Sequence, residues 1–194
     1  MNIYDFDGTI YDGDSCKDLI IYGLKRYPKL TLKSLNKTIK LMKDYKANLI
    51  EFEIVKESLL SFIFKIDNYE DFIDEFVNIN MKKIKPWYLS QKKEDDIIIT
   101  ASCDLWIDKF ANKLGLKNII ATKIGKNGKL ITKNCKGKEK VNRFRNQFSK
   151  LIPDSSYSDS KVDIPILEIA KKAFIVEGNK IIPYKKGYNF KHKK

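Results

Sequence analysis

The strongest constraint on the fold is a change of hydrophobic pattern along the chain. Residues 2–4 form a short apolar run, and residues 15–84 then place apolar side chains at the spacing of amphipathic helices. After Pro86, short apolar β-type runs alternate with helical stretches. These runs lie at 97–100, at 119–122, near 157 and at 173–176. Strands that alternate with helices predict a parallel sheet covered by helices.

The helical stretch divides into four predicted helices. Residues 28–29 separate the first two, residues 46–48 separate the next pair, and residues 67–68 can start the fourth. We therefore expect an α/β fold: a Rossmann-like parallel sheet core flanked by helices, with a four-helix cap inserted after the first strand. The expected boundaries are 1–14 and 85–194 for the catalytic core and 15–84 for the cap.

Two smaller features follow from local patterns. Residues 121–124 and 129–132 predict a hairpin, because the Asn127-Gly128 pair between them supplies the positive backbone angles of a tight turn. The basic tail from 185 to 194 is expected to be loosely ordered. The aromatic residues Trp87, Tyr88 and Trp106 are expected in the core, although stacking on a base is the alternative.

Composition excludes several classes of protein. A chain of 194 residues with 43% apolar residues can bury a core of its own. Its apolar runs are far shorter than the roughly 20 residues of a membrane-spanning helix, and the start MNIYDFDGT does not resemble a secretory signal. We expect a cytoplasmic protein without a membrane span. Its cysteines are widely separated and its one histidine, His192, lies in the tail, so neither a zinc site nor a disulfide framework is predicted.

The formal net charge is +13. Such an excess attracts nucleic acid, an anionic membrane surface or small phosphorylated substrates alike. Because the lysines are spread along the whole chain, we expect a generally basic surface. A dedicated patch for nucleic acid is the less favoured alternative.

The most informative motif is DFDGTIYDGDS at residues 5–15, in which two carboxylates follow a short apolar strand. Alone, this segment could be an ordinary turn. Polar residues also end two later strands, at 100–102 and 157–163, and residues 134–141 deliver lysines at the start of a helix. The carboxyl ends of parallel strands share one edge of a sheet, so we expect these segments to converge on one crevice.

The combined set of acids, a hydroxyl and a cation suits phosphoryl transfer. A nucleophile must approach phosphorus in line while the charge on the phosphate oxygens is neutralised. A carboxylate can attack a phosphate held against it by Mg²⁺ and form an acyl phosphate that water later cleaves. Oxygen ligands suit that hard cation.

These four segments, in this order, resemble the four motifs of the haloacid dehalogenase superfamily. The branch that is most similar is that of phosphoserine phosphatase, because a helical cap follows the first motif and the last motif reads YSDSKVDIPIL. The resemblance implies a Mg²⁺-dependent phosphatase that hydrolyses a small phosphomonoester through an aspartyl-phosphate intermediate. Dehalogenases of this superfamily lack the second aspartate, whose presence here favours phosphate chemistry.

The resemblance also implies a role for each residue. Asp5 is the expected nucleophile and metal ligand, and Asp7 is the expected general acid and base, with its backbone carbonyl on the metal. Ser102 and Lys140 are expected to bind the phosphate, although Lys136 and Lys138 compete with Lys140. Asp159 is the third expected metal ligand, and two further residues, Asp163 and Thr9, are expected to support the site.

Substrate recognition is less specific in the sequence. Asp14 stands where phosphoserine phosphatases carry a glutamate for the substrate's amino group, and it can equally cap the following helix. No arginine stands early in residues 28–60 to hold a substrate carboxylate. The predicted partner is therefore a small phosphorylated metabolite of unspecified class. Two alternatives remain: a non-catalytic module that binds polyanions, and a phosphotransferase or nucleotide-end phosphatase with the same chemistry.

Overall fold

The computed structural model describes residues 1–190, so His192 lies outside the described residues. Within this range, six strands form one sheet in the order β3-β2-β1-β4-β5-β6. The strands are β1 (Asn2–Tyr4), β2 (Ile97–Cys103), β3 (Asn118–Thr122), β4 (Ser155–Ser158), β5 (Lys172–Glu177) and β6 (Lys180–Pro183). Strands β1 to β5 pair in parallel, and β6 pairs antiparallel with β5. The expected Rossmann-like sheet is confirmed, with an additional antiparallel strand at one edge.

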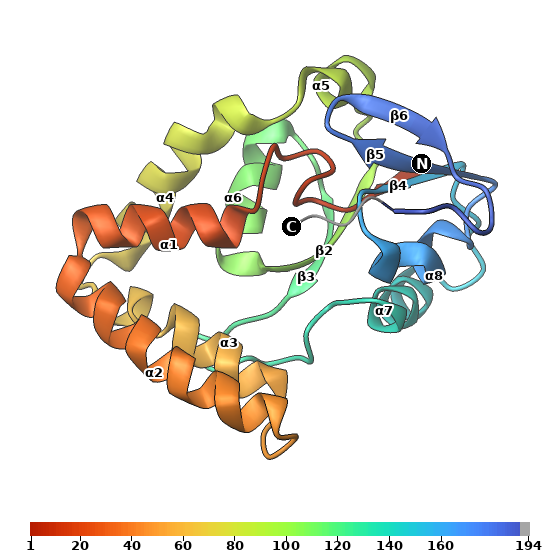
Figure 1. The fold of residues 1–194 in the computed structure, drawn as a ribbon. Coiled ribbons are helices and arrows are strands. Elements are labelled where there is room, and N and C mark those ends of the chain that lie inside the picture. The colour runs from red at the N-terminus through yellow and green to blue at the C-terminus, as the bar shows by residue number, and fades with distance from the viewer. Residues whose placement is uncertain (191–194) are drawn as a thin grey trace.

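Eight α-helices accompany this sheet within residues 1–190. They are α1 (Ser15–Arg26), α2 (Pro28–Lys46), α3 (Phe52–Leu60), α4 (Tyr69–Asn80), α5 (Pro86–Gln91), α6 (Asp104–Leu114), α7 (Lys138–Phe148) and α8 (Ile164–Leu167). Short 3₁₀ helices lie at Ile63–Lys65, Met81–Lys83 and Lys161–Asp163. In Figure 1, α1 to α4 gather on the left of the sheet, while α7 and α8 lie on its right.

Both faces of the sheet are apolar, as a parallel sheet between helices requires. Ile97 and Ile99 of β2 pack in a cluster with Phe144 of α7 and Ile166 of α8. The intervening Ile98 belongs to a larger cluster on the other face, which includes residues of α6 and of the helices between β1 and β2. The alternation along β2 therefore separates the two helical layers.

The four predicted cap helices are present between β1 and β2, and their breaks lie where the sequence indicated. Asp14 caps α1 by accepting a hydrogen bond from the Lys17 backbone N–H at 2.9 Å. Pro28 begins α2 at a position where its missing N–H costs nothing. Gly23 of α1 lets Phe62 approach closely, because a Cβ at this glycine would lie 2.5 Å from the phenyl ring.

The predicted hairpin at 121–132 forms as a short antiparallel pairing, without two regular strands. Its Asn127-Gly128 turn forms, with Gly128 at φ 75°, and an isolated bridge joins Ile124 to Leu130. The Gly125 N–H donates to the Lys129 carbonyl at 2.8 Å, and the Ile131 N–H donates to the Lys123 carbonyl at 2.9 Å.

The hairpin and the chain that follows it are also bonded to α3. The Leu130 N–H donates to Glu57, and the Asn134 N–H donates to Glu53. The acids of α3 thus hold this segment against the cap.

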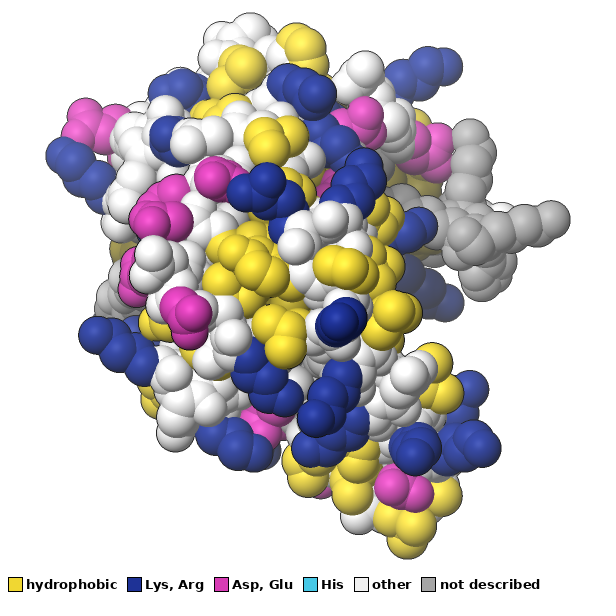
Figure 2. All heavy atoms as spheres, turned by 90° about the vertical axis from the view of Figure 1, so that its left-hand side faces the viewer, with side chains coloured by type: hydrophobic (Ala, Val, Ile, Leu, Met, Phe, Trp, Pro, Cys, Tyr) yellow, Lys and Arg dark blue, Asp and Glu magenta, His cyan; other side chains and the backbone are white. Residues whose placement is uncertain are grey.

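Figure 2 shows the side of the molecule that carries the helices on the left of Figure 1. Lysine and arginine side chains are scattered over the whole height of this face, among acidic and apolar ones. The lower lobe, at the height of α2 and α3 in Figure 1, projects below a notch. None of the helices in residues 1–190 is long and apolar enough to cross a membrane.

Candidate active site

The first motif forms a tight loop at the carboxyl end of β1. The Asp5 backbone N–H donates to the Tyr157 carbonyl at 3.0 Å, which holds this residue at the level of β4. The chain then turns at Gly8, whose φ of 72° is easily adopted only by glycine. The Gly8 N–H donates to the Gly13 carbonyl at 2.8 Å, so the loop closes on itself. Asp5 and Asp7 consequently lie within one short, fixed segment.

A buried ion cluster joins Asp5 to two later motifs. The Lys140 ammonium lies 2.7 Å from an Asp5 carboxylate oxygen and 2.7 Å from one of Asp163. The Lys140 residue is 2% exposed, whereas its predicted competitors Lys136 and Lys138 are exposed at the surface. Of the three lysines, Lys140 is therefore the one in contact with the expected nucleophile. Its role as a phosphate ligand stays a prediction.

Asp7 is held by a second network, which reaches across to the cap. The Ser102 hydroxyl donates to one Asp7 carboxylate oxygen at 2.5 Å, and the Ser15 backbone N–H donates to the other at 2.6 Å. The Trp106 indole N–H in turn donates to the Ser15 hydroxyl at 2.9 Å. Ser102 is thus in contact with the predicted general acid, and its predicted contact with phosphate remains a proposal.

The last motif is bonded to the first motif from the neighbouring strand β4. The Asp159 backbone N–H donates to the Thr9 hydroxyl at 3.1 Å, which ties β4 to the first motif. The Ser158 hydroxyl donates to Asp163 at 2.8 Å, so this serine supports the carboxylate that shares Lys140. The structure therefore brings Asp5, Asp7, Ser102, Lys140, Asp163, Thr9 and the Asp159 backbone to one edge of the sheet.

Burial sets the protonation of these groups. It raises the pKa of Asp7, and hydrogen bonds from Ser102 and Ser15 oppose this rise. It also raises the pKa of Asp5, against the opposing charge of Lys140. Although burial lowers the pKa of Lys140, the charges of Asp5 and Asp163 raise it overall, so this residue stays an ammonium. A raised pKa favours the protonated form that a general acid needs.

The oxygen-rich cluster of side chains at this edge of the sheet fits a hard divalent cation. Asp5 and Asp7 lie in one loop and the chain at Asp159 is bonded to that loop, so carboxylate and carbonyl oxygens outnumber the single Lys140 ammonium. Among residues 1–190, no group of three or more His, Cys, Asp or Glu side chains gathers as metal ligands. The predicted metal ligands include only two carboxylates, those of Asp5 and Asp159, because the third protein ligand is the Asp7 backbone carbonyl.

Sequence reasoning missed several residues that shape the site. Ser15 and Trp106 act through contacts between distant segments, and no local pattern marks them. Ser158 stands within the last motif, where the family usually has glycine, but its contact with Asp163 was not predicted. Lys85 was also missed: it is 3% exposed and donates to the carbonyl oxygens of Gly8 at 2.6 Å and Gly178 at 2.7 Å. Its ammonium fixes the turn that follows Asp7.

The Asp14 side chain caps α1, which is the second of the two roles predicted for it, and the residue is exposed. A role of Asp14 in binding the substrate remains a prediction.

The aromatic residues expected in the core are confirmed there. Tyr88 and Trp106 are fully buried, and Trp87 packs against Tyr4 with ring centres 6.3 Å apart.

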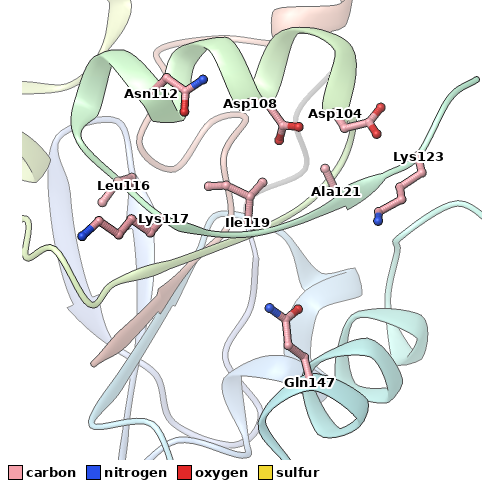
Figure 3. A pocket seen from close by; sticks show the side chains of 9 residues that line it. All are labelled: Asp104, Asp108, Asn112, Leu116, Lys117, Ile119, Ala121, Lys123 and Gln147. Atoms are coloured by element: carbon pink, nitrogen blue, oxygen red, sulfur yellow. The ribbon is translucent and has the colours of Figure 1, made fainter. Parts of the chain in front are cut away.

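An open groove of about 530 Å³ lies elsewhere, along the edge strand β3. Figure 3 shows Asp104 and Asp108 projecting from α6 on one side of β3 and Gln147 from α7 on the other. Burial raises the pKa of both acids. The residues that line this groove include none of the predicted site residues, so the groove is separate from the candidate site.

The sequence comparison decides the family. The profile of the haloacid dehalogenase-like hydrolases matches residues 3–168, which spans all four motifs. The chain belongs to this family. No curated protein matches the sequence. The matched range includes Asp5, Asp7 and Lys140.

Solved structures share this fold at low sequence identity. A protein of unknown function from Bordetella pertussis Tohama I has a TM-score of 0.68 at 18% identity, covering 89% of this chain and 87% of that one. A phosphoserine phosphohydrolase-like protein from Francisella tularensis subsp. tularensis SCHU S4 has a TM-score of 0.53 at 19% identity, covering 89% and 84%. A probable phosphoserine phosphatase from Vibrio cholerae has a TM-score of 0.56 at 12% identity, covering 89% and 55%. The expected fold of this haloacid dehalogenase-like hydrolase is thereby confirmed.

Proposed function

We propose that this hydrolase is a Mg²⁺-dependent phosphatase that cleaves a small phosphomonoester through an aspartyl-phosphate on Asp5. The observation that carries the proposal is the buried contact of Asp5 with Lys140 and, through it, with Asp163. A lysine shared by two carboxylates keeps the Asp5 side chain oriented. It also provides a positive charge for the phosphate oxygens.

The reaction would proceed in two displacements. An Asp5 carboxylate oxygen attacks phosphorus, the bond from phosphorus to the ester oxygen breaks, and Asp7 gives its proton to that leaving oxygen. Water then attacks phosphorus, Asp7 takes up its proton, and the bond from phosphorus to Asp5 breaks. Inorganic phosphate leaves and both aspartates are restored.

Mg²⁺ would bind beside Asp5 in the same cluster. Asp5, the Asp7 backbone carbonyl and Asp159 would hold it, and Asp163 would support the site together with Thr9. When bound, the cation supplies charge neutralisation for the phosphate oxygens that face the nucleophile. The names of the structures similar in fold, a phosphoserine phosphohydrolase-like protein and a probable phosphoserine phosphatase, support phosphomonoester hydrolysis as the reaction class.

Residues 15–84 are proposed to act as a cap that excludes water while the phosphate is transferred. The remaining ranges, 1–14 and 85–194, would form the catalytic core. We propose a small phosphorylated metabolite as the substrate and the cytoplasm as the location. Binding of nucleic acid stays the weaker alternative, since the acids of the site are all retained.

The test is phosphate release from a panel of phosphorylated metabolites and an aryl phosphate, with Mg²⁺ or with a chelator. Asp5→Asn is compared with Asp12→Asn, because Asp12 is an exposed carboxylate of the same loop. We expect release that requires both Mg²⁺ and Asp5, and that survives the Asp12 substitution. If the native protein releases no phosphate from any compound while it binds polyanions with a steep salt dependence, the binding-module alternative is correct.

A further inference from the structure

The helix α2 buries polar side chains and exposes apolar ones, which is the reverse of the usual order. Its three buried residues, Thr31, Ser34 and Thr38, all carry hydroxyl groups. The Ser34 hydroxyl donates to the Leu59 carbonyl at 2.9 Å, and the Thr38 hydroxyl donates to that of Ser58 at 3.1 Å. These acceptors belong to α3, so the buried side of α2 contacts its neighbour through polar groups.

Large apolar side chains of the same two-helix lobe, residues 28–60, lie at the surface instead. Leu32 and Ile39 are 51% and 61% exposed, and they share one stripe of α2 because they are about two helical turns apart. Leu49, in the loop between α2 and α3, is 73% exposed, and Tyr45 and Ile54 on either side of this loop are also exposed. Residues 32–54 thus hold five of the eleven large apolar side chains that are exposed within residues 1–190.

Unpaired lysines accompany these apolar side chains. The helix α2 carries six lysines and a single acid, Asp44. The six lysines are Lys29, Lys33, Lys37, Lys40, Lys43 and Lys46. All are exposed, and none forms an ion pair with an acid in the part of the chain that the structure describes. Figure 2 shows basic and apolar side chains next to one another on the projecting lower lobe.

The combination indicates a partner that is both apolar and negatively charged. An anionic membrane meets both conditions, because its acyl chains lie directly beneath a layer of acidic headgroups. Nucleic acid would attract the lysines, but its bases stack on aromatic rings and not on leucine or isoleucine. A second copy of this chain would bring two strongly basic helices together, and their charges would repel one another.

We propose that the lobe of residues 28–60 docks on an anionic lipid surface. Leu49 and the stripe of Leu32 and Ile39 enter the headgroup layer, and the lysines of α2 contact the acidic headgroups. The association is peripheral, because the apolar side chains reach only the outer part of the bilayer. It uses none of the residues of the candidate active site, so it does not depend on the proposed reaction.

Flotation of the whole protein with lipid vesicles tests this proposal. Vesicles of phosphatidylcholine alone are compared with vesicles of phosphatidylcholine and phosphatidylglycerol in equal parts, at physiological ionic strength. Two variants separate the contributions of the lobe. Ile39→Ser with Leu49→Ser removes exposed apolar side chains, and Lys37→Gln with Lys40→Gln and Lys43→Gln removes three charges.

Each variant has a matched control at exposed residues outside the lobe. Ile152→Ser with Leu89→Ser removes two apolar side chains that are also exposed. Lys113→Gln with Lys172→Gln and Lys180→Gln removes three exposed charges. The controls therefore have the same composition as the lobe variants and differ from them only in position.

We expect the native protein to bind the mixed vesicles and not the neutral ones. The lysine variant should lower the partition coefficient about a hundredfold, since each lysine near an anionic surface contributes roughly a factor of five. The apolar variant should lower it at least about tenfold, the factor that burial of one such side chain is roughly worth. The controls should stay within about threefold of the native protein, because distant charges are screened.

Failure of the native protein to bind either kind of vesicle would overturn the proposal, and so would equal losses in the lobe variants and their controls. Binding that needs the lysines but not the apolar side chains, with equal affinity for duplex DNA, would assign the lobe to polyanions instead. A dimer in sedimentation velocity that the apolar variant abolishes would assign it to a second copy. If the double serine variant does not fold, Leu49→Ser alone decides: weaker binding supports the proposal and unchanged binding overturns it.

Discussion

At the scale of single residues, the site depends on one buried cation between two carboxylates. Lys140, Asp5 and Asp163 have side chains that are 3%, 11% and 4% exposed. The cluster holds one ammonium and two carboxylates. Loss of Lys140 therefore leaves two buried carboxylates without a cation, whereas loss of one carboxylate leaves the other paired with Lys140.

Lys140→Met should lower the free energy of unfolding by about 3–5 kcal/mol, because it leaves two buried carboxylates without a cation. Urea denaturation at neutral pH measures this change. Lys138→Met, at an exposed neighbouring lysine, is the control and should change stability by less than about 0.5 kcal/mol. Adding Asp163→Asn to the Lys140 variant should restore part of the loss, and the absence of any restoration would show that the cluster is not coupled.

The sequence identified most of these residues because each follows a predicted strand or starts a predicted helix. Asp5, Asp7 and Asp163 can be recognised in the sequence because they follow apolar runs that predict strands. Lys140 is the lysine on the buried face of α7. Ser15 and Trp106 could not be found in the same way. They are 91 positions apart, and their hydrogen bond exists only because α1 and α6 are neighbours in the folded chain.

At the scale of secondary structure, local sequence signals mark the ends of the cap helices. Proline and Asp/Asn positions predicted the helix ends, since these residues act locally. The hairpin at 121–132 was predicted from its Asn-Gly turn and forms as a short pairing. Its contacts with Glu53 and Glu57 could not be predicted, because these acids lie far away in the sequence. Strand β6 was missed because only two apolar residues precede Pro183, and proline is tolerated at such an edge.

Gly23→Ala tests the contact between α1 and the rest of the cap. Alanine favours a helix over glycine by about 1 kcal/mol, but the added Cβ would lie 2.5 Å from Phe62. We expect the steric conflict to prevail and the variant to lose about 1–3 kcal/mol of stability. Thermal unfolding compares it with Asn36→Ala on the exposed face of α2, which should be neutral or slightly stabilising. A more stable Gly23 variant would mean that Phe62 is free to move.

At the scale of the whole molecule, the cap and the sheet share one hydrophobic core. Phe76 of α4 contacts Phe110 of α6 with ring centres 6.2 Å apart, and Phe110 contacts Phe6, which follows β1, at 5.3 Å. These side chains belong to a single buried cluster that extends into both parts of the chain. The contacts of α3 with residues 129–134 are polar by comparison.

Because of this shared core, unfolding should be a single cooperative transition. Far-ultraviolet circular dichroism reports all helices, including those of residues 15–84. The fluorescence of Trp87 and Trp106 reports only the part of the chain that follows residue 84. The two signals should give coincident denaturation curves. Two separate midpoints would show that the cap unfolds independently.

The proposed reaction requires that Asp5 becomes phosphorylated during turnover. The most direct measurement is to quench the native protein in acid while it turns over a hydrolysable phosphomonoester with Mg²⁺, reduce it with borohydride and sequence the peptides by mass spectrometry. Because borohydride converts an acyl phosphate to an alcohol, we expect homoserine in place of Asp5 and in no other position. Steady phosphate release with an unmodified Asp5, or with the modification at another carboxylate, would show that Asp5 is not the nucleophile.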